Sequence, residues 1–479
     1  MGDKGMWELK APKIVVEPPG PRVRELLEAA GLPPTFLQPI VEKAEGIWIK
    51  DPDGNVFMDF ISSRCVVNIG HRHPKIVNVL SRKIEQVTHG LTVERLRLEE
   101  ELARVTPGSF PKRASYALSG SAANDCSIKL ARWATRRPYI ISFAGAYHGV
   151  TYGALSVSSY LPRMVKGFGP NVPGIYNMPY PYCYRCPFGL EHPDCDLRCL
   201  RYIEEYAFKS YIPPDEVAAV TFEPIEGDAG WIVPPDGWIQ GLKELCERHG
   251  ILLIAEEVQT GFGRTGRWFA CEHWGLEPNI IVLGKAMAGG IPMSAVVARA
   301  DLFEREEERF YHGHTFGGHP LGCAAALATI EVIKYEELVE NAERMGAHIK
   351  RRLEEMKEEH GLIGDVRGKG LLIGVEIIKD EKSRAPGLEE ADKICASAFR
   401  RGLYMISMGA FGTCNLRVAP PLVITIEQAD VALDILEEAI SEVEPPRMRK
   451  MKPMPMEDEP EREGLLDIKR IKESYPEGD

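Results

Sequence analysis

The chain has 479 residues, of which 44% are hydrophobic, and a formal net charge of −12. A chain of this length can bury a large core and is expected to hold two or three domains, because domains contain about 100–200 residues each. The acidic balance excludes nucleic acid as the main partner, since a phosphate backbone favours a basic protein face. The N-terminus lacks the apolar core of a signal peptide and no apolar run approaches the ~18 residues that span a bilayer, so we expect a soluble, cytoplasmic protein without a membrane partner.

Residues 1–72 are expected to form an N-terminal arm and segment. The run RVRELLEAAG predicts a short helix that ends at Gly31. Residues 46–60, GIWIKDPDGNVFMDF, contain two alternating runs joined by Asp-Pro-Asp-Gly, which predicts a β-hairpin. The apolar spacing at 73–87 and 94–105 is typical of amphipathic helices.

From about residue 114 to 300, short apolar runs alternate with helical stretches. This alternation predicts βα units and a mostly parallel sheet, within a large α/β domain over residues 73–335. Residues 336–444 are expected to form a smaller α+β domain, and residues 445–479 a poorly packed tail. Ligands of such sheets bind at the carboxyl ends of the strands.

Two apolar runs end on polar groups that suggest chemistry. ILLIA (251–255) is followed by Glu256, and NIIVLG (279–284) is followed by Lys285. A partly desolvated lysine loses its proton readily and can form a Schiff base, and a nearby carboxylate can pair with a pyridine nitrogen. The pair therefore favours pyridoxal phosphate as cofactor. Alternatively, Glu256 is an ordinary strand-end charge and Lys285 an ordinary loop lysine.

Three further motifs can serve the same cofactor. LSGSAAND (118–125) places Gly120 and Ser121 at a strand-to-helix junction, where free backbone N–H groups bind anions, although Ser-Gly-Ser is also plain capping chemistry. Tyr147 in GAYHG follows an apolar run and can stack on a flat ring. Thr315 lies in a second Gly-rich turn, HTFGGHP. His148 is interpreted as structural.

Taken in order, these motifs resemble the class III aminotransferases, which are pyridoxal-phosphate enzymes of fold type I. The matching motifs are SGSAAN, GAYHG, EPIEGDAG, IAEEVQTGFGRTG, VLGKAMAGG, HTFGGHPLGCAAA and LRVAPPL, and they span roughly residues 20 to 440. The resemblance implies a large domain with a mostly parallel, seven-stranded sheet flanked by helices. It also implies a smaller α+β domain built from N- and C-terminal segments.

The resemblance also implies a role for each matched residue. Lys285 would bind the cofactor covalently, and Arg417 would face the substrate. Thr315 would reach the phosphate of the neighbouring subunit, which implies a homodimer with the active site at its interface. The other cofactor contacts would be the phosphate ligands Gly120 and Ser121, the stacking residue Tyr147, the ring-nitrogen partner Glu256, Val258 beneath the ring, and Gln259 near the ring hydroxyl.

Two departures from the family pattern bear on the reaction. Val150 replaces an arginine that grips the substrate carboxylate in many aminotransferases, and Asp228 stands where ω-aminotransferases commonly carry glutamate. Amino-acid racemases and isoleucine 2-epimerases of the family combine the lysine with an aspartate there. Racemisation needs acid/base groups on both faces of the cofactor, which Lys285 and Asp228 could supply. Alternatively, Asp228 is only the ion-pair partner of Arg417.

The sequence therefore favours a racemase or epimerase for neutral, bulky aliphatic amino acids such as leucine, methionine or isoleucine. The main alternative is an ω-aminotransferase of the 4-aminobutyrate or ornithine type, with 2-oxoglutarate as amino acceptor. A binding protein that has lost catalysis is disfavoured because Lys285 and the phosphate motifs are intact. Arg64, near the expected substrate entrance, binds a distal carboxylate or forms an ion pair at the dimer interface.

Residues 181–199, the cysteine-rich insert, read PYCYRCPFGLEHPDCDLRC. Its pairs Cys183/Cys186 and Cys195/Cys199 have a spacing that fits zinc ligation. The gap between the pairs is shorter than in common zinc motifs, so one or two disulfides and four free thiols remain alternatives. In each case the insert braces a loop and does not take part in the chemistry.

Overall fold

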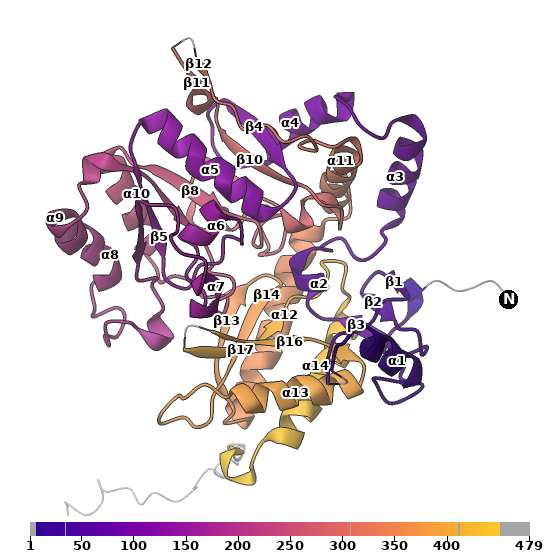
Figure 1. Ribbon diagram of the computed structural model, residues 1–479. Coiled ribbons are helices and arrows are strands. Elements are labelled where there is room, and N and C mark those ends of the chain that lie inside the picture. Colours follow the sequence, from indigo (N-terminus) through magenta and orange to yellow (C-terminus); the bar gives the residue numbers. More distant parts are fainter. Residues whose placement is uncertain (1–5, 34, 307, 411, 451–479) are drawn as a thin grey trace, which may run out of the picture.

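The computed structural model describes residues 6–450, except 34, 307 and 411. A seven-stranded sheet forms its centre (Figure 1). Its strands are, in spatial order, β4 (Lys112–Ala117), β10 (Ser294–Arg299), β9 (Ile280–Leu283), β8 (Leu252–Glu256), β7 (Val217–Phe222), β5 (Tyr139–Phe143) and β6 (Ile175–Met178). Only β10 runs antiparallel to its neighbours, so the predicted mostly parallel sheet is confirmed.

The central strands β7, β8 and β9 are almost completely buried and mostly apolar, as is typical of parallel strands that are covered on both faces. Alternate residues point to opposite faces. Ile254 and Ile280 pack beneath α5 (Gly120–Thr135), whereas Leu253 and Ile281 belong to the larger core that contains α10 (Trp238–His249) and α11 (Pro320–Tyr335). Figure 1 shows α5 lying across one face of the sheet.

A second layer of structure combines both ends of the chain. Its antiparallel sheet has the order β13 (Ile363–Lys369), β14 (Leu372–Ile377), β17 (Thr413–Val418) and β16 (Ile406–Ala410), and it packs with α12 (Leu338–Glu359), α13 (Leu388–Arg400) and α14 (Ile426–Val443). The predicted hairpin forms β2 (Trp48–Lys50) and β3 (Val56–Asp59), flanked by β1 (Lys43–Glu45). Strand β15 (Leu403–Tyr404) pairs with β3 in parallel, so N- and C-terminal segments do share a sheet.

The remaining helices surround these sheets. They are α1 (Pro21–Ala29), the single turn α2 (Ser62–Cys65), α3 (Pro74–Gln86), α4 (Val93–Val105), α6 (Tyr152–Val157), α7 (Pro162–Val165), α8 (Arg198–Tyr202), a π-helical turn at Ile203–Ala207, and α9 (Phe208–Ser210). Short 3-10 turns occur at Met6–Glu8, Cys183–Arg185, Pro214–Glu216, Ala270–Trp274, Lys285–Ala288, Ala300–Phe303 and Pro446–Met448, and a two-stranded ribbon is formed by β11 (Glu304–Arg305) and β12 (Glu308–Arg309). The helices predicted at 73–87 and 94–105 are α3 and α4.

The start of the expected tail pairs with the end of α12. The Gly361 amide donates to the Met448 carbonyl over 3.0 Å, and the Lys450 amide donates to the Glu359 carbonyl over 3.0 Å. Residues 451–479 lie outside the described part of the chain. No helix between residues 6 and 450 is long and apolar enough to cross a bilayer.

Candidate active site

A cavity of about 160 Å³ lies at the carboxyl ends of β7, β8 and β9. Eight of the predicted site residues line it, and Asn124, His148, Gly149 and Glu223 complete its wall. The eight are Gly120, Ser121, Tyr147, Asp228, Glu256, Val258, Gln259 and Lys285. Thr315, Arg417, Arg64 and Val150 do not line it. The carboxyl edge of the sheet therefore gathers most of the predicted residues, as the βα pattern indicated.

Lys285 enters the cavity directly after β9. Its backbone has a φ of 43°, in the left-handed region that a non-glycine residue rarely adopts. Such strained residues cluster at functional sites, where surrounding structure holds them in place. Lys285 is only partly buried and lines the cavity together with Glu223, Asp228 and Glu256.

Val258 forms a floor between two glycines. A Cβ atom on Gly120 would come within 3.1 Å of Val258 Cγ1, and one on Gly284 within 3.2 Å. The absence of side chains at both positions lets the valine lie flat between the start of α5 and the end of β9. The Val258 side chain consequently forms an apolar wall of the cavity, and its neighbours on both sides hold it in place.

The N-terminus of α5 opens on the cavity. Ser119 caps the helix, since its side chain accepts a hydrogen bond from the Ala122 amide over 3.2 Å. The first amides of a 16-residue helix lack partners within the helix, and they attract anions. Ser121 Oγ accepts from the Val150 amide over 3.1 Å, which ties the GAYHG loop to this helix start.

Glu256 is the last residue of β8 and is 4% exposed. One carboxylate oxygen accepts from the Val258 amide over 2.7 Å, and the other lies 3.4 Å from His148 Nδ1. His148 is buried, and neither of its ring nitrogens has a hydrogen-bond partner in the described structure. The histidine that we interpreted as structural therefore lines the cavity beside the predicted ring-nitrogen partner.

Glu223 is a site residue to which sequence reasoning gave no role. It follows β7 directly, and its carboxylate accepts from the Tyr147 amide over 2.8 Å and the Gly227 amide over 2.7 Å. Burial and the neighbouring Glu256 raise the pKa of its carboxyl group. The sequence could have indicated Glu223 as a site residue, because it follows an apolar run directly, as Lys285 does. Glu223 fixes the backbone of Tyr147, the residue predicted to stack on the cofactor ring.

Asp228 and Arg417 form the ion pair that the family resemblance implies. Arg417 Nη1 lies 3.0 Å from Asp228 Oδ1, and the guanidinium stacks on the Trp231 ring with a separation of 5.1 Å. Burial alone would raise the pKa of Asp228, but the positive charges of Arg417 and Lys285 outweigh it and hold the pKa below its usual value. Arg417 Nε is buried without a partner in the described structure. Gln259, beside this pair, accepts from the Trp231 indole over 3.0 Å.

Arg64 lies on the left-handed turn of residues 62–65, in which all four φ values are between 47° and 66°. Asp59 fixes this turn by accepting from the Ser63 amide over 2.8 Å. The Arg64 side chain is exposed, and its positive charge lowers the pKa values of Tyr147 and Asp228, although burial keeps the pKa of Tyr147 above its usual value. Arg64 does not line the cavity, but its charge acts on two residues of the wall, Tyr147 and Asp228.

Val150 and Thr315 are both exposed in the single chain. Val150 lies next to the cavity wall, because its amide contacts Ser121. Thr315 lies in the turn before α11 and is absent from the cavity of its own subunit. Its predicted contact with a neighbouring subunit stays a prediction.

Cys183, Cys186, Cys195 and Cys199 surround one small cavity of the insert, and all four are free thiols. Burial raises the pKa of Cys183 to about 11 and that of Cys199 to about 12, which favours neutral thiols. Within the described residues, three possible metal-ligand atoms come within 4.8 Å of one another only in His148, Glu223 and Glu256. Zinc ligation by the four cysteines therefore stays only an alternative to four free thiols.

The chemistry of the wall fits pyridoxal phosphate. The helix start suits the phosphate, the apolar floor suits the face of a ring, and a buried carboxylate suits the ring nitrogen. Added Cβ atoms at Gly120 or Gly284 would crowd this floor, so the cradle depends on glycines at both positions. Lys285, which lines the same cavity, would supply the amine for the aldehyde.

Comparisons with known proteins agree with this site. Residues 33–440 match the Aminotransferase class-III family. The chain is 42% identical to an alanine/serine racemase of Pyrococcus horikoshii, over 91% of this chain and 94% of that protein. It is 42% identical to a leucine/methionine racemase of Thermococcus litoralis, over 86% and 93%. An amine transaminase from an uncultivated Pseudomonas species, solved in its pyridoxal-phosphate-bound form, superposes with a TM-score of 0.77 at 30% identity, over 85% and 95%.

The family match covers most of the chain, and the fold, the strand-end lysine and the phosphate cradle agree with it. The chain belongs to the class III aminotransferase family, and it is a pyridoxal-phosphate enzyme of the racemase or aminotransferase type.

Proposed function

We propose that this protein is a pyridoxal-phosphate-dependent racemase of neutral amino acids that moves the Cα proton with two groups, Lys285 and Asp228. One observation carries the proposal: an aspartate and the strand-end lysine line the same small cavity. They are close enough for the lysine charge to lower the pKa of the aspartate. The relatives at 42% identity are racemases of neutral amino acids, which supports the same reaction class.

Bound pyridoxal phosphate withdraws electrons from Cα of the substrate and thereby makes its proton acidic. Glu256, buried at the strand end, keeps the ring nitrogen protonated. Lys285 takes or returns the proton on one face of the substrate. Asp228 does so on the other, so that the returning proton inverts the centre.

Asp228 has to leave Arg417 for this role. A carboxylate that stays paired with a guanidinium is a weak base, because the positive charge holds its pKa low. The substrate α-carboxylate can replace Asp228 on the planar fork of Arg417, and the partnerless Nε gives that fork a further donor. Substrate binding would then raise the pKa of Asp228 at the step that needs a base.

Neutral side chains are the substrates that the wall favours. Val150 is apolar and cannot bind a second carboxylate of the substrate, whereas many aminotransferases have an arginine at this position. Arg64 is a further positive charge that acts on the cavity wall. Because Arg417 is assigned to the substrate α-carboxylate and the relatives' substrates carry no distal carboxylate, we assign Arg64 to an ion pair at the subunit interface.

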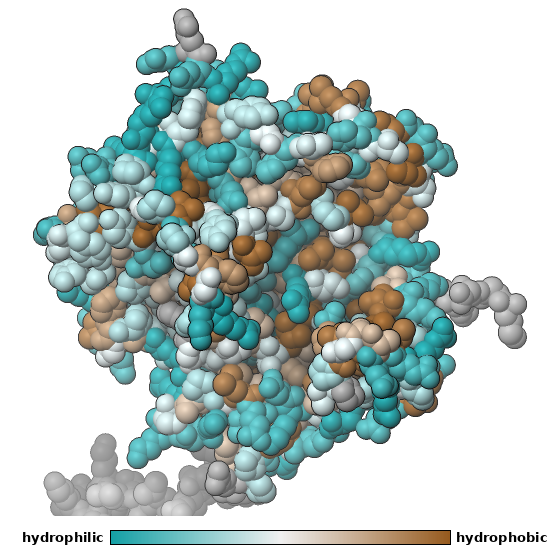
Figure 2. Space-filling model, viewed as in Figure 1, coloured by the Kyte–Doolittle hydropathy of each residue, from teal (hydrophilic) through white to brown (hydrophobic). Residues whose placement is uncertain are grey.

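We further propose that the active unit is a homodimer. Large apolar side chains are exposed on α3, α4 and the loop before α11, and Figure 2 shows them as brown clusters on this face. They include Ile84, Leu91, Val93, Leu96 and Phe316. Burial of this face by a second copy would cover the patch and carry Thr315 towards the partner's phosphate site.

The function is tested by incubating the protein and pyridoxal phosphate with L-leucine, and separately with L-alanine, without any 2-oxo acid. Chiral chromatography should show the D-enantiomer rising until the two forms are equal, while the cofactor absorbance is unchanged at the end. An aminotransferase would give no D-enantiomer, would convert the cofactor to its amine form, and would turn over only after 2-oxoglutarate is added. That second result would overturn the proposal.

A further inference from the structure

We propose that Arg367 is a positioning residue for the reaction. It lies on the smaller antiparallel sheet and holds the loop that carries Asp228. This inference rests on the proposed function, in which Asp228 moves a proton. The Asp228 loop is defined as residues 227–231, and Arg367 belongs to β13, more than one hundred residues later in the chain.

Three successive carbonyls of the Asp228 loop are held by side chains of one sheet. Arg417 Nη2 donates to the Asp228 carbonyl over 3.2 Å. The Thr413 hydroxyl lies 3.0 Å from the Ala229 carbonyl oxygen and 2.8 Å from the Ala410 carbonyl oxygen, so its one proton is shared between these two acceptors. Arg367 Nε donates to the Gly230 carbonyl over 2.7 Å, the shortest of the three. The smaller sheet thereby contacts the loop at Asp228, Ala229 and Gly230.

The strand pattern explains why these donors lie together. Thr413 and Arg417 are four residues apart on β17 and so share one face of the sheet. Arg367 pairs with Gly374 of β14, which pairs in turn with Arg417. A Cβ atom on Gly374 would lie 2.9 Å from the Gly230 carbonyl oxygen, so glycine at this position lets the loop approach the sheet closely.

Arg367 is itself held by a buried carboxylate. Its Nη2 donates to Glu376 Oε2 over 2.8 Å and its Nη1 to Asp365 Oδ2 over 3.1 Å. Glu376 is fully buried on β14. The guanidinium nitrogens Nε, Nη1 and Nη2 each donate a hydrogen bond. The orientation of the Nε–H group towards the Gly230 carbonyl is therefore fixed.

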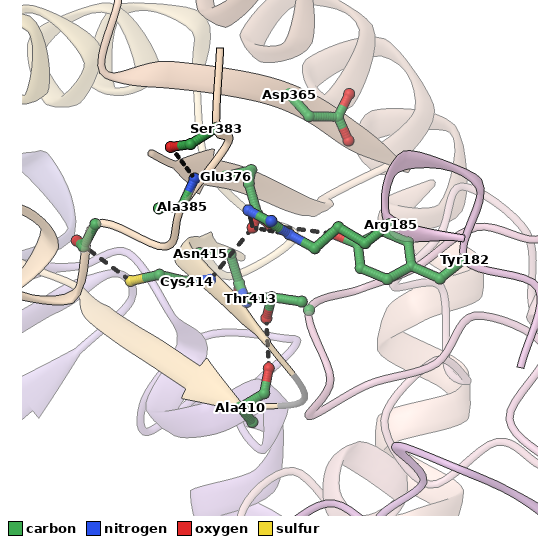
Figure 3. Close-up of polar contacts among 12 residues, drawn as sticks. Tyr182, Arg185, Asp365, Glu376, Ser383, Ala385, Ala410, Thr413, Cys414 and Asn415 are labelled. Carbon is green, nitrogen blue, oxygen red and sulfur yellow. Dashed lines mark hydrogen bonds and ion pairs between the residues drawn. The ribbon is translucent and has the colours of Figure 1, made fainter. Parts of the chain in front are cut away.

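The cysteine-rich insert completes the support. Arg185 forms a bidentate pair with Glu376 Oε1, at 3.1 and 2.8 Å, and the Tyr182 hydroxyl donates to Oε2 over 3.2 Å. Figure 3 shows Arg185 reaching Glu376 beside Tyr182. The Tyr182 ring also lies 5.3 Å from the Arg367 guanidinium. Two arginines and the carboxylates of Glu376 and Asp365 balance in charge, so the buried network is neutral overall.

Loss of this support should affect Asp228 before it affects Lys285. The lysine follows β9 and has no part in the network, whereas Asp228 lies two residues from the carbonyl that Arg367 holds. A displaced loop would move the Asp228 carboxyl group away from its place in the cavity wall, where it has to meet the substrate. Racemisation needs both groups, but formation of the 2-oxo acid and the amine form of the cofactor needs only the lysine.

The test uses Arg367→Lys, which keeps the charge but cannot reach Gly230, Glu376 and Asp365 together, and Thr413→Val, which removes a single donor. Arg352→Lys is the matched control, because Arg352 belongs to an ion network between α12 and α14. For each variant, racemisation and half-transamination are measured with L-leucine. Half-transamination is the formation of the 2-oxo acid and of the amine form of the cofactor. Amide hydrogen exchange of residues 225–233 is measured in the cofactor-free protein, and Asp228→Asn serves as reference.

We expect Arg367→Lys to slow racemisation by about tenfold to a hundredfold, since small misplacements of a reacting group have effects of that size. Half-transamination should stay close to that of the unsubstituted protein, and the amides of Gly230 and Trp231 should exchange faster. Thr413→Val should act in the same direction, and Arg352→Lys should change nothing. Unchanged exchange, or equal loss of both reactions, would overturn the inference. Racemisation retained by Asp228→Asn would instead overturn the proposed function, while the exchange data would still decide whether Arg367 holds the loop.

Discussion

The carboxyl groups of Glu223, Glu226 and Asp228 lie in one short segment, yet their pKa values are moved in different directions. Burial raises the pKa values of Glu223 and Glu226. Burial acts on Asp228 as well, although its side chain is 19% exposed, but the charges of Arg417 and Lys285 outweigh burial and lower its pKa. The two nearby cations therefore give Asp228 a lower pKa than those of Glu223 and Glu226.

Glu226 is predicted to cost stability as the pH rises. Its carboxyl is fully buried without a hydrogen-bond partner in the described structure, and its pKa lies well above 4.5. Between the unfolded and the raised folded pKa, the folded state alone holds the proton, so this group lowers the free energy of unfolding by about 1.4 kcal/mol per pH unit. Glu226→Gln should remove the effect.

The measurement is chemical denaturation of the cofactor-free protein and of Glu226→Gln. The free energy of unfolding of Glu226→Gln minus that of the unsubstituted protein should increase by roughly 1–3 kcal/mol between about pH 5.5 and pH 7.5. A difference that stays constant or shrinks over this range would mean that the buried carboxyl is not protonated in the folded protein.

At the scale of elements, the phosphate cradle depends on two segments that approach without side chains between them. The GAYHG loop meets the start of α5 at Gly149, whose φ is 135°. A Cβ atom there would overlap Ser121 Oγ and come within 2.6 Å of Ser121 Cβ. Only glycine lets the loop and the helix start close around one anion.

Gly149→Ala should therefore weaken pyridoxal phosphate binding. Overpacking of this kind costs about 1–3 kcal/mol, and 1.4 kcal/mol is a factor of ten, so the dissociation constant should rise about tenfold or more. Gly90→Ala is a matched control, because Gly90 has a φ of 139° and open space where the Cβ would lie. Cofactor titration followed by absorbance gives the dissociation constant of each variant. A Gly149→Ala dissociation constant equal to that of Gly90→Ala and of the unsubstituted protein would show that the phosphate cradle does not depend on Gly149.

The sequence predicted these elements well where a pattern is local. Apolar runs that end on Glu256 and Lys285 predicted two central strands, and Gly120 and Ser121 predicted the helix start. Strand β6, IYNM, was missed because its short run includes a polar residue and borders a proline-rich loop. Arg367 and Glu376 were missed as well, since a charged residue in a short strand is usually typical of a solvent-facing side.

At the scale of the whole molecule, the site is shared between two sheets. The central sheet supplies Lys285 and Glu256 from its carboxyl edge, and the smaller sheet holds the Asp228 loop through Arg417, Thr413 and Arg367. No local pattern reports such a contact, because its partners are far apart in the chain. The resemblance of motifs supplied the cofactor and Arg417, while the support behind Asp228 required the folded structure.

This division between sheets gives the central claim a direct test. Asp228→Asn keeps the size of the side chain but removes its capacity as an acid or base. General acid–base groups contribute about 10²–10⁴-fold, so racemisation should fall by that order. Lys285 should continue to exchange the proton on its own face.

The measurement is deuterium incorporation at Cα from pure L-leucine and, separately, from pure D-leucine, with Asp228→Asn in deuterated water and no 2-oxo acid. The account predicts that one enantiomer exchanges its Cα proton without inversion, that the other does not exchange, and that the two no longer interconvert. Exchange of both enantiomers and their interconversion at the unsubstituted rate would contradict it.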